Sequence, residues 1–514
     1  MRRRLLVVAG VLAGAGVLAA AARATWPAPS SAISGSALVH ISLPDIGGTL
    51  KSVRVATTAG RVVPVQVRGG DIWPAGTLPQ GERLVVEVSV RRPGWVGWLV
   101  GSTVTRTFDV TTPTIHVRAT VLHVRPGDGV AVHFDAPAAV TSIDGVVHRQ
   151  DRIVLPIETT ETAGAVDVAA AARSWERLST PVHVSWFPTG VSQAVVATPA
   201  PGTKLGPAQR VTLTFSSAIG RTLPPIETTA PGHWQVLDDH SIAFDPTSAG
   251  FPLGGRVKIT LPRALRAVLP TTGLVAGTLS WPVETGTTLR LQELLAQLDY
   301  LPLRWQGAAP ARTIAAQVDA AVAPPSGTFA WRWTTVQTSL RALWKPGAQN
   351  LITQAALMRF EDAHGLPLEA APTPTVWHDL FADVVAGRLN TEGYTYVLVH
   401  ETLPESLRLW HNGKLVLTTP GNTGIPQAPA APGTFPVFEH IPEGTMSGTN
   451  PDGSHYNDPG VRWISYFHGG DAIHAFPRGS YGTPQSLGCV ELPYSAAAQV
   501  WPYTPVGTLV TIQQ

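Results

Sequence analysis

The sequence predicts a multidomain, mostly β protein with one small α-helical domain ahead of its last β domain. Three observations lead to this fold class. The 514 residues are too many for one hydrophobic core, because single cores stop growing at roughly 250–300 residues. Forty-six prolines and 49 glycines separate many short apolar runs, a pattern typical of strands and turns. Between residues 287 and 388 the apolar pattern changes to a helical period.

The chain begins with a basic segment and an apolar run. Met1 to Arg4 holds three arginines, and Leu5 to Ala22 contains no charged residue. We expect an N-terminal apolar helix within a segment of residues 1–34 that ends in a Pro/Ser linker. Because Ala22-Arg23-Ala24 resembles a cleavage site, a cleaved export signal and a single membrane anchor are alternatives. The length of the run and Arg23 favour the anchor, and either alternative places the rest of the chain outside the cytoplasm.

Three β-rich stretches follow, at residues 35–112, 113–188 and 189–286. Each has the size of a small β-sandwich and contains alternating apolar runs between glycine- and proline-containing turns. Examples are Leu84–Val90, Val182–Trp186 and Val211–Ser216. The third stretch resembles the immunoglobulin-like modules of bacterial wall enzymes. We interpret all three as tandem spacers that hold the C-terminal domain away from the N-terminus.

The helical segment, residues 287–388, is predicted to be a separate small domain. Leucines recur near helical spacing at Leu291, Leu294, Leu295 and Leu298, and a second helical run covers 353–361. These two runs resemble the small three-helix peptidoglycan-binding domain. An insertion at 303–345 interrupts the likeness, so a helical linker without a ligand is the alternative.

Composition excludes one class of partner and singles out one residue type. The net charge is +2, only 14% of residues are charged, and no basic run follows the first few residues, which argues against nucleic acid. Sixteen tryptophans are unusual. We expect most of them in cores, with some free to stack on sugars.

Cys489 is the single cysteine of the chain. In an exported protein one cysteine cannot form an internal disulfide, which leaves a reactive thiol, an intermolecular bridge or a buried apolar residue. His474 lies fifteen positions earlier, and an imidazole can withdraw the thiol proton to make a nucleophile. Gly488 permits close approach of an acyl group, its backbone N–H can stabilise an oxyanion, and Ser486 can hydrogen-bond within the same turn.

A histidine, fourteen intervening residues and Ser-x-Gly-Cys resemble the signature of the L,D-transpeptidases, cysteine enzymes that cross-link bacterial peptidoglycan. The resemblance covers residues 391–514 and implies a mostly β catalytic domain with a cleft above one sheet. An Asn-Gly turn predicts a hairpin within this domain. The segments that carry the likeness are Tyr396–Val399, Leu407–Leu417, Gly421–Gly424, Ala431–Phe435, Ala496–Val500 and Gly507–Ile512.

Two residues depart from the family pattern, which usually reads Ser-His-Gly-Cys, an apolar residue, then Arg or Asn. This chain has Leu487 and Glu491 at those places. Leu487 removes a polar contact but leaves the backbone donors. Glu491 reverses the expected charge, which would weaken recognition of a substrate carboxylate or favour an amine.

Further site residues follow from the resemblance and from loop composition. The resemblance implies that His474 is the base and that the Ala475 carbonyl orients its ring. His468 is expected to line the pocket. The Gly-rich segment 439–458 is expected to be a lid, and Met446 and Tyr456 on it to contact the donor.

The resemblance implies L,D-transpeptidase activity in the cell wall through a Cys489 thioester, with release of the terminal D-alanine. The partners are peptidoglycan stem peptides, glycan strands if the helical domain binds them, and β-lactam inhibitors such as carbapenems. The alternatives are an L,D-carboxypeptidase, a transferase that attaches another amine to the wall, and a non-catalytic wall-binding scaffold. No cofactor is expected, and the scattered histidines do not have the spacing of a metal site.

Overall fold

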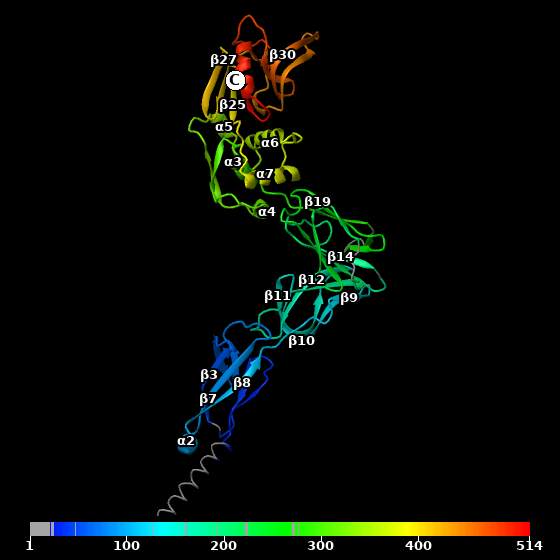
Figure 1. Cartoon of the computed structure of the whole chain (residues 1–514), viewed down its shortest axis with the longest axis vertical. Helices are drawn as coiled ribbons and strands as arrows, with labels where there is room; N and C mark the ends of the chain where they lie inside the picture. The colour runs from blue at the N-terminus through cyan, green and yellow to red at the C-terminus, as the bar shows by residue number, and fades with distance from the viewer. Residues whose placement is uncertain are drawn as a thin grey trace, which may run out of the picture.

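The computed structural model describes residues 25–46, 48–125, 127–159, 163–191, 193–220, 225–269 and 277–514, with isolated positions at 21, 161 and 273–275. These parts form a row of units, with the N-terminal unit at one end and the C-terminal domain at the other (Figure 1). The predicted N-terminal apolar helix lies almost wholly outside the described residues. Within them, no helix is long and apolar enough to cross a membrane.

The first unit contains two β-sheets packed around an apolar core that includes Val55, Ile72 and Val86. One sheet has the order β1 (Ser30–Ala32), β2 (Val39–Ser42), β6 (Asp71–Pro74), β5 (Val65–Arg68). The other has the order β4 (Val62–Val63), β3 (Thr49–Thr57), β7 (Arg83–Arg91), β8 (Thr103–Thr111). A short helix, α2 (Gly94–Val100), connects β7 and β8.

The second unit is built on one sheet, and the third on two. The second has the order β11 (Val146–Ile157), β10 (Val130–Ile143), β12 (Gly164–Ala171), β13 (Val182–Pro188), β9 (Val121–Val124). The larger sheet of the third has the order β17 (Gly232–Val236), β18 (Ser241–Pro246), β15 (Val211–Phe215), β14 (Ala194–Thr198), β20 (Arg266–Leu269), β21 (Gly273–Val275). Its smaller sheet has the order β16 (Glu227–Thr228), β19 (Arg256–Thr260), β22 (Thr278–Pro282).

The helical unit follows the predicted helical period, and polar side chains cap its helices. Thr287, Asn350 and Thr373 each accept a backbone N–H of the first helical turn. The insertion folds into a two-stranded antiparallel sheet whose connection contains one helix, and a second helix follows the sheet. The elements are α3 (Thr288–Gln297), β23 (Leu303–Gly307), α4 (Ile314–Val322), β24 (Gly327–Trp331), α5 (Thr338–Ala342), α6 (Leu351–Ala363) and α7 (Pro374–Ala386).

The C-terminal domain packs two sheets against each other. The first has the order β27 (Lys414–Pro420), β26 (Ser406–His411), β25 (Thr395–His400), β33 (Leu509–Gln513), β28 (Gly433–Pro436). The second has the order β29 (Glu439–Thr449), β30 (His455–His468), β31 (Asp471–Ala475), β32 (Val490–Leu492), and α8 (Tyr494–Val500) precedes a 3₁₀ turn at Trp501–Tyr503. The predicted Asn-Gly hairpin is confirmed: Asn412 and Gly413 both have positive φ between β26 and β27.

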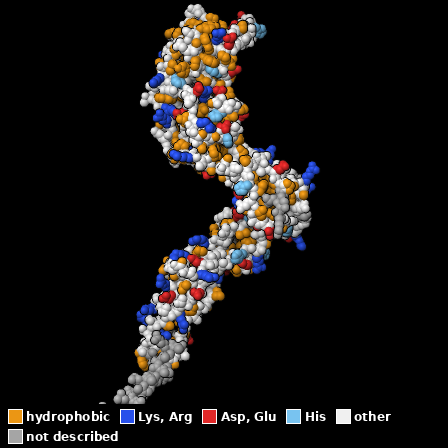
Figure 2. All heavy atoms as spheres, viewed as in Figure 1, with side chains coloured by type: hydrophobic (Ala, Val, Ile, Leu, Met, Phe, Trp, Pro, Cys, Tyr) orange, Lys and Arg blue, Asp and Glu red, His pale blue; other side chains and the backbone are white. Residues whose placement is uncertain are grey.

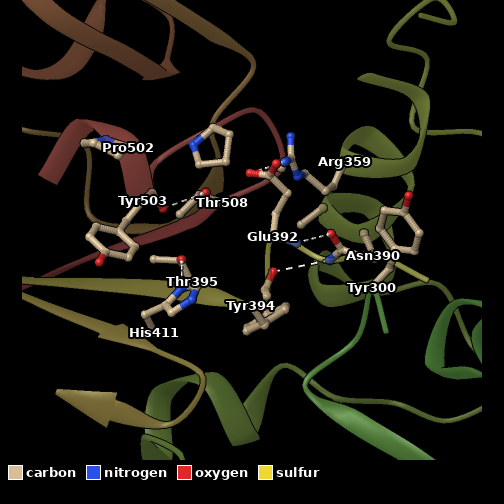
Figure 3. Close-up of a pocket in the computed structure, with 15 residues that line it drawn as sticks. Tyr300, Arg359, Asn390, Glu392, Tyr394, Thr395, His411, Pro502, Tyr503 and Thr508 are labelled. Carbon is tan, nitrogen blue, oxygen red and sulfur yellow. Dashed lines mark hydrogen bonds and ion pairs between the residues drawn. The ribbon is translucent and has the colours of Figure 1, made fainter. Parts of the chain in front are cut away.

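The helical unit and the C-terminal domain share one hydrophobic core. Tyr396, Leu398 and Leu509 of the first sheet pack in the same cluster as the leucines of α3 and α6. A small pocket of about 40 Å³ lies along this junction. Figure 3 shows Arg359 of α6 beside Glu392. Arg359 Nη2 lies 3.2 Å from Glu392 Oε2. The sequence boundary near residue 390 therefore does not separate two independent cores.

Gly507 of the C-terminal domain lies in close contact with the helical unit, so a substitution there measures how tightly the two pack. Its φ is +83°, and an added Cβ would lie 2.4 Å from the Ala355 carbonyl oxygen of α6. Gly469, with φ +52° and nothing within 4 Å of an added Cβ, is the matched control. We expect Gly469→Ala to cost about 1 kcal/mol from backbone strain alone. Gly507→Ala should cost about 1–3 kcal/mol more. Calorimetric unfolding of both variants measures this, and equal shifts would contradict the close fit.

Candidate active site

The parallel pairing of β31 with β32 brings the candidate nucleophile and base onto one wall. Ile473 pairs with Val490 and His474 with Glu491. Because alternate residues of a strand point to the same face, Cys489 and Glu491 share the face of His474. Cys489 directly precedes β32, at the end of the loop that returns from β31. Cys489 and His474 are fifteen positions apart in the sequence, but Cys489 lies directly before the neighbouring strand, only two residues before Glu491, the pairing partner of His474.

Both side chains line an open groove of about 940 Å³. The walls are the cysteine loop, β31 and the hairpin β29–β30. The lining residues are Ile425, Gln427, Thr445, Met446, Ser447, Asn450, Pro451, Asp452, Tyr456, Asp458, Tyr466, Gly470, Asp471, His474, Phe476, Arg478, Gln485, Ser486, Leu487, Cys489 and Glu491. The pocket of Figure 3 shares no residue with this groove.

His474 is buried, with 3% of its surface exposed, and its ring is fixed by the backbone. Nδ1 lies 3.1 Å from the Ala475 carbonyl oxygen, so Nδ1 carries the proton and Nε2 keeps a lone pair. The Phe476 ring meets the imidazole edge-on at 5.9 Å. Burial lowers the His474 pKa below its ordinary 6.5, despite the opposing effect of the Ala475 hydrogen bond. The imidazole is therefore neutral at neutral pH and can accept a proton.

Cys489 is a free thiol whose sulfur hydrogen-bonds the backbone. Its Sγ lies 3.7 Å from the Gly470 carbonyl oxygen, and the structure gives it no bond to His474 among the described contacts. Burial raises the Cys489 pKa to about 12, and the charges of Asp471 and Glu491 act in the same direction. The resting pair is therefore a neutral thiol and a neutral imidazole. A thiolate forms here only when its proton is transferred.

The loop before Cys489 is held by Ser486 and by Gly488, whose positive φ is unfavourable for residues with a side chain. Ser486 Oγ donates to the Cys489 carbonyl oxygen (2.7 Å) and accepts the Gly488 N–H (3.2 Å). Gly488 has φ +116°, and an added Cβ would lie 2.3 Å from Asp471 Oδ1. Since Ser486 already occupies the Gly488 N–H, that donor is engaged within the turn.

Glu491 lines the groove, but both its oxygens are bound to Arg478. Arg478 Nε and Nη2 each lie 2.7 Å from a Glu491 oxygen, and Nη2 also donates to the Gln485 carbonyl at 3.1 Å. The Arg478 guanidinium stacks over Phe476, 4.7 Å from the ring centre. The charge reversal noted in the sequence is thus neutralised within the protein. Sequence reasoning missed Arg478, although it is the one charged residue between His474 and Cys489.

Met446 and Tyr456 both lie in the groove, on a β-hairpin with one register shift just before Met446, rather than on an irregular loop. Gly448 pairs with Tyr456 across the two strands, and the tyrosine ring covers the space where a Gly448 side chain would be. The expected lid at 439–458 therefore has strand structure on both sides of a short turn. Glycine marks close packing here, not an irregular segment.

His468 does not line the groove. Its ring packs against Phe435 at 4.5 Å, and Nδ1 lies 3.3 Å from Asp471 Oδ2. Asp471 itself does face the groove and was not singled out from the sequence. Among the described residues there is no cluster of three or more His, Cys, Asp or Glu side chains that could hold a metal.

The fold and the groove define a β-rich domain with a cysteine and a histidine on one groove wall. Residues 394–512 match the YkuD family profile, the L,D-transpeptidase catalytic domain. This segment is therefore an L,D-transpeptidase catalytic domain, which indicates an enzyme of that family. No curated protein matches the chain.

Several solved structures are similar to the chain. An L,D-transpeptidase from Mycobacterium smegmatis is 12% identical, with 62% of this chain and 97% of that one covered and a TM-score of 0.22. L,D-transpeptidase 3 from Mycobacterium tuberculosis, in complex with a faropenem-derived adduct, has the same values. The catalytic domain of the E. faecium enzyme is 27% identical, with 24% and 99% covered and a TM-score of 0.22. At these TM-scores the superpositions carry no part of the assignment, which rests on residues 394–512.

The raised thiol pKa predicts slow alkylation of Cys489 at neutral pH. Moving the pKa from 9.0 to about 12 lowers the thiolate fraction about 1,000-fold. The rate of iodoacetamide modification, followed by mass spectrometry, should keep rising beyond about pH 10. A plateau below about pH 8 would contradict this environment.

Asp471→Asn removes one negative charge beside the sulfur and should lower the Cys489 pKa. We expect alkylation about 2–10-fold faster near pH 8, where one pKa unit equals tenfold in thiolate. Asp452→Asn is the control, because Asp452 lies in the same groove at the exposed hairpin tip.

Proposed function

We propose that this protein is an L,D-transpeptidase that cross-links peptidoglycan stem peptides through a Cys489 thioester. One observation carries the proposal. Cys489 and a buried, backbone-oriented His474 share one wall of a groove within residues 394–512, the segment with the L,D-transpeptidase profile. The groove is open and large enough for an extended peptide, as a donor stem and an acceptor amine require.

In the proposed reaction His474 Nε2 takes the proton of Cys489 Sγ as the sulfur attacks the carbonyl of the third stem residue. The bond from that carbonyl to the terminal D-alanine breaks, and the D-alanine nitrogen leaves with the proton held by His474. The amine of a second stem then attacks the thioester. Its proton passes through His474, and the Cys489 thiol is restored.

The electrostatics of the groove support concerted proton transfer. A separated thiolate would lie near Asp471 and Glu491, and burial disfavours both a free thiolate and an imidazolium. Arg478 offsets the Glu491 charge. Attack therefore requires a bound acyl group that accepts the negative charge, and the Cys489 backbone N–H is the donor we assign to the resulting oxyanion.

The hairpin β29–β30 supplies the opposite wall, and we assign donor contact to its Met446 and Tyr456. A second reaction follows from the openness of the groove. Water reaches the thioester whenever no amine occupies the acceptor side, and hydrolysis then gives L,D-carboxypeptidase activity. Transfer to another wall amine would use the same thioester. A non-catalytic wall scaffold is the alternative from a different class.

We further propose that the chain works outside the cytoplasm in the cell wall, with the three β units as spacers. Figure 1 places the C-terminal domain and the N-terminal unit at opposite ends of the row. On the face shown in Figure 2, acidic and basic side chains are interspersed, in keeping with the net charge of +2. Glycan binding by the helical unit is part of this proposal.

Acylation by a carbapenem tests the two central residues. Cys489→Ala should give no covalent adduct in mass spectrometry, and His474→Ala should slow adduct formation about 10²–10⁴-fold through loss of the general base. His378→Ala is the control, because His378 is exposed on α7 and its ring contacts Asp379, outside the groove, and its rate should stay close to that of the unmodified protein. An adduct on Cys489→Ala, or equal slowing by both histidine variants, would contradict the assignment.

Product analysis separates the transpeptidase from the carboxypeptidase. The purified protein is incubated with a disaccharide-tetrapeptide, and mass spectrometry counts dimers that have lost one D-alanine against free tripeptide. Dimers support the transpeptidase, and tripeptide alone supports the carboxypeptidase. If a carbapenem reacts with Cys489 but neither product forms, the tetrapeptide is not the donor and the proposed reaction is contradicted. If neither reagent reacts, the scaffold alternative replaces the proposal.

A further inference from the structure

Helix α2 presents two tryptophans to solvent at one end of the first unit. Trp95 is 69% exposed and Trp98 is 82% exposed, and they are the only exposed tryptophans among the sixteen, all of which the structure describes. The opposite face of the helix is anchored, because Val96 and Val100 are buried. The side chain of Arg92 donates to the carbonyls of Val100 and Gly101. The outward apolar face is therefore held in place by the unit beneath it.

The polar atom of one exposed indole is already hydrogen-bonded within the helix. Trp98 Nε1 donates to the Trp95 carbonyl oxygen at 2.9 Å, so the polar atom of the most exposed indole is already satisfied. Moving that ring out of water then leaves no unpaired N–H, which would otherwise cost free energy. A third apolar side chain, Ile46, is 55% exposed. Its loop meets the start of α2, since a Cβ on Gly48 would touch the Arg91 carbonyl oxygen.

The position of α2 in the chain indicates which kind of surface its apolar face contacts. The uncharged apolar run of residues 5–22 ends four residues before Trp26. The Trp26 ring packs against Trp95 at 5.7 Å with an interplanar angle of 68°. Figure 1 shows α2 at the end of the first unit that is remote from the second unit. The apolar face thus lies where the chain leaves an eighteen-residue stretch with the composition of a membrane segment.

The charged side chains directly beside α2 are mainly basic. Residues 88–108 contain no Asp or Glu but include Arg91 and Arg106, both exposed, whereas one exposed carboxylate, Asp45, lies next to Ile46. Arg91 ends β7 directly before the helix, and Arg106 lies on the paired strand β8. Tryptophan favours the headgroup level of bilayers, and nearby arginines are attracted to anionic lipids.

We propose that residues 5–22 enter a bilayer and that α2, with Trp95, Trp98 and Ile46, is a membrane-contact face that seats the first unit on that bilayer. The occupant is the headgroup region of an anionic lipid surface. The first unit then contacts the membrane directly and is not attached to it through a linker alone. This proposal is independent of the chemistry at Cys489.

The single native cysteine makes a site-specific test straightforward. Full-length protein carrying Cys489→Ser and Trp98→Cys is labelled with the environment-sensitive dye NBD and reconstituted into phosphatidylethanolamine–phosphatidylglycerol vesicles. The matched control is Val62→Cys in the same background. Val62 is 53% exposed and pairs with Ala56, at the far end of β3, roughly 23 Å along the strand from its α2 end. A label at Ile46→Cys tests the second contact without altering the helix.

We expect the labels at 98 and 46 to shift their emission to the blue and to be quenched by a nitroxide-bearing lipid. The label at 62 should stay aqueous and unquenched. Equal thermal unfolding midpoints of the three labelled chains exclude misfolding as the cause. Aqueous emission from both 98 and 46 would overturn the proposal, and so would equal quenching at all three positions.

Discussion

The parallel pairing of β31 with β32 is the constraint on which the site depends. It sets Cys489 and His474 on one face, yet the loop between them must reverse within a small space. Gly488 makes that reversal possible through its positive φ, with the Asp471 carboxylate filling the position of its missing side chain. Ser486 then ties the turn to the Cys489 carbonyl. Sequence spacing alone would not hold the thiol beside the imidazole without these contacts.

The environment of the pair keeps both groups neutral until an acyl group is bound. Burial acts on each group against its charged form, so the thiol pKa rises and the imidazole pKa falls. Glu491 would add an unpaired buried charge beside them, at a cost of several kcal/mol. Arg478 removes that cost by binding both carboxylate oxygens. The departure at position 491 is thus accompanied by a cation thirteen residues earlier, and the two residues are best understood together.

Parts of the fold and of the candidate site could be predicted from the sequence, and other parts could not. The Asn412–Gly413 turn has a distinctive local chemistry, and the helical runs at 291–298 and 353–361 follow a clear period. The insertion at 303–345 has no such period, and it contains the strands β23 and β24. The Arg478–Glu491 pair connects two loops, so no periodicity reveals it. The glycines of segment 439–458 predict a lid and give no sign of strands, but Tyr456 packs over Gly448 and both flanks pair as strands. The shared core across residue 390 escaped notice because strand and helix patterns are each locally complete.

These features bear on the scaffold alternative. A domain kept only for binding has no need of a buried imidazole, a thiol held near two carboxylates, or a glycine pressed against Asp471. Each of these costs folding free energy, since burying polar groups and unusual backbone conformations are both unfavourable. Apolar residues at 474, 489 and 491 would remove most of that cost in a non-catalytic domain. Their joint presence around one groove therefore favours the catalytic proposal, because local destabilisation of this kind is expected where chemistry requires it.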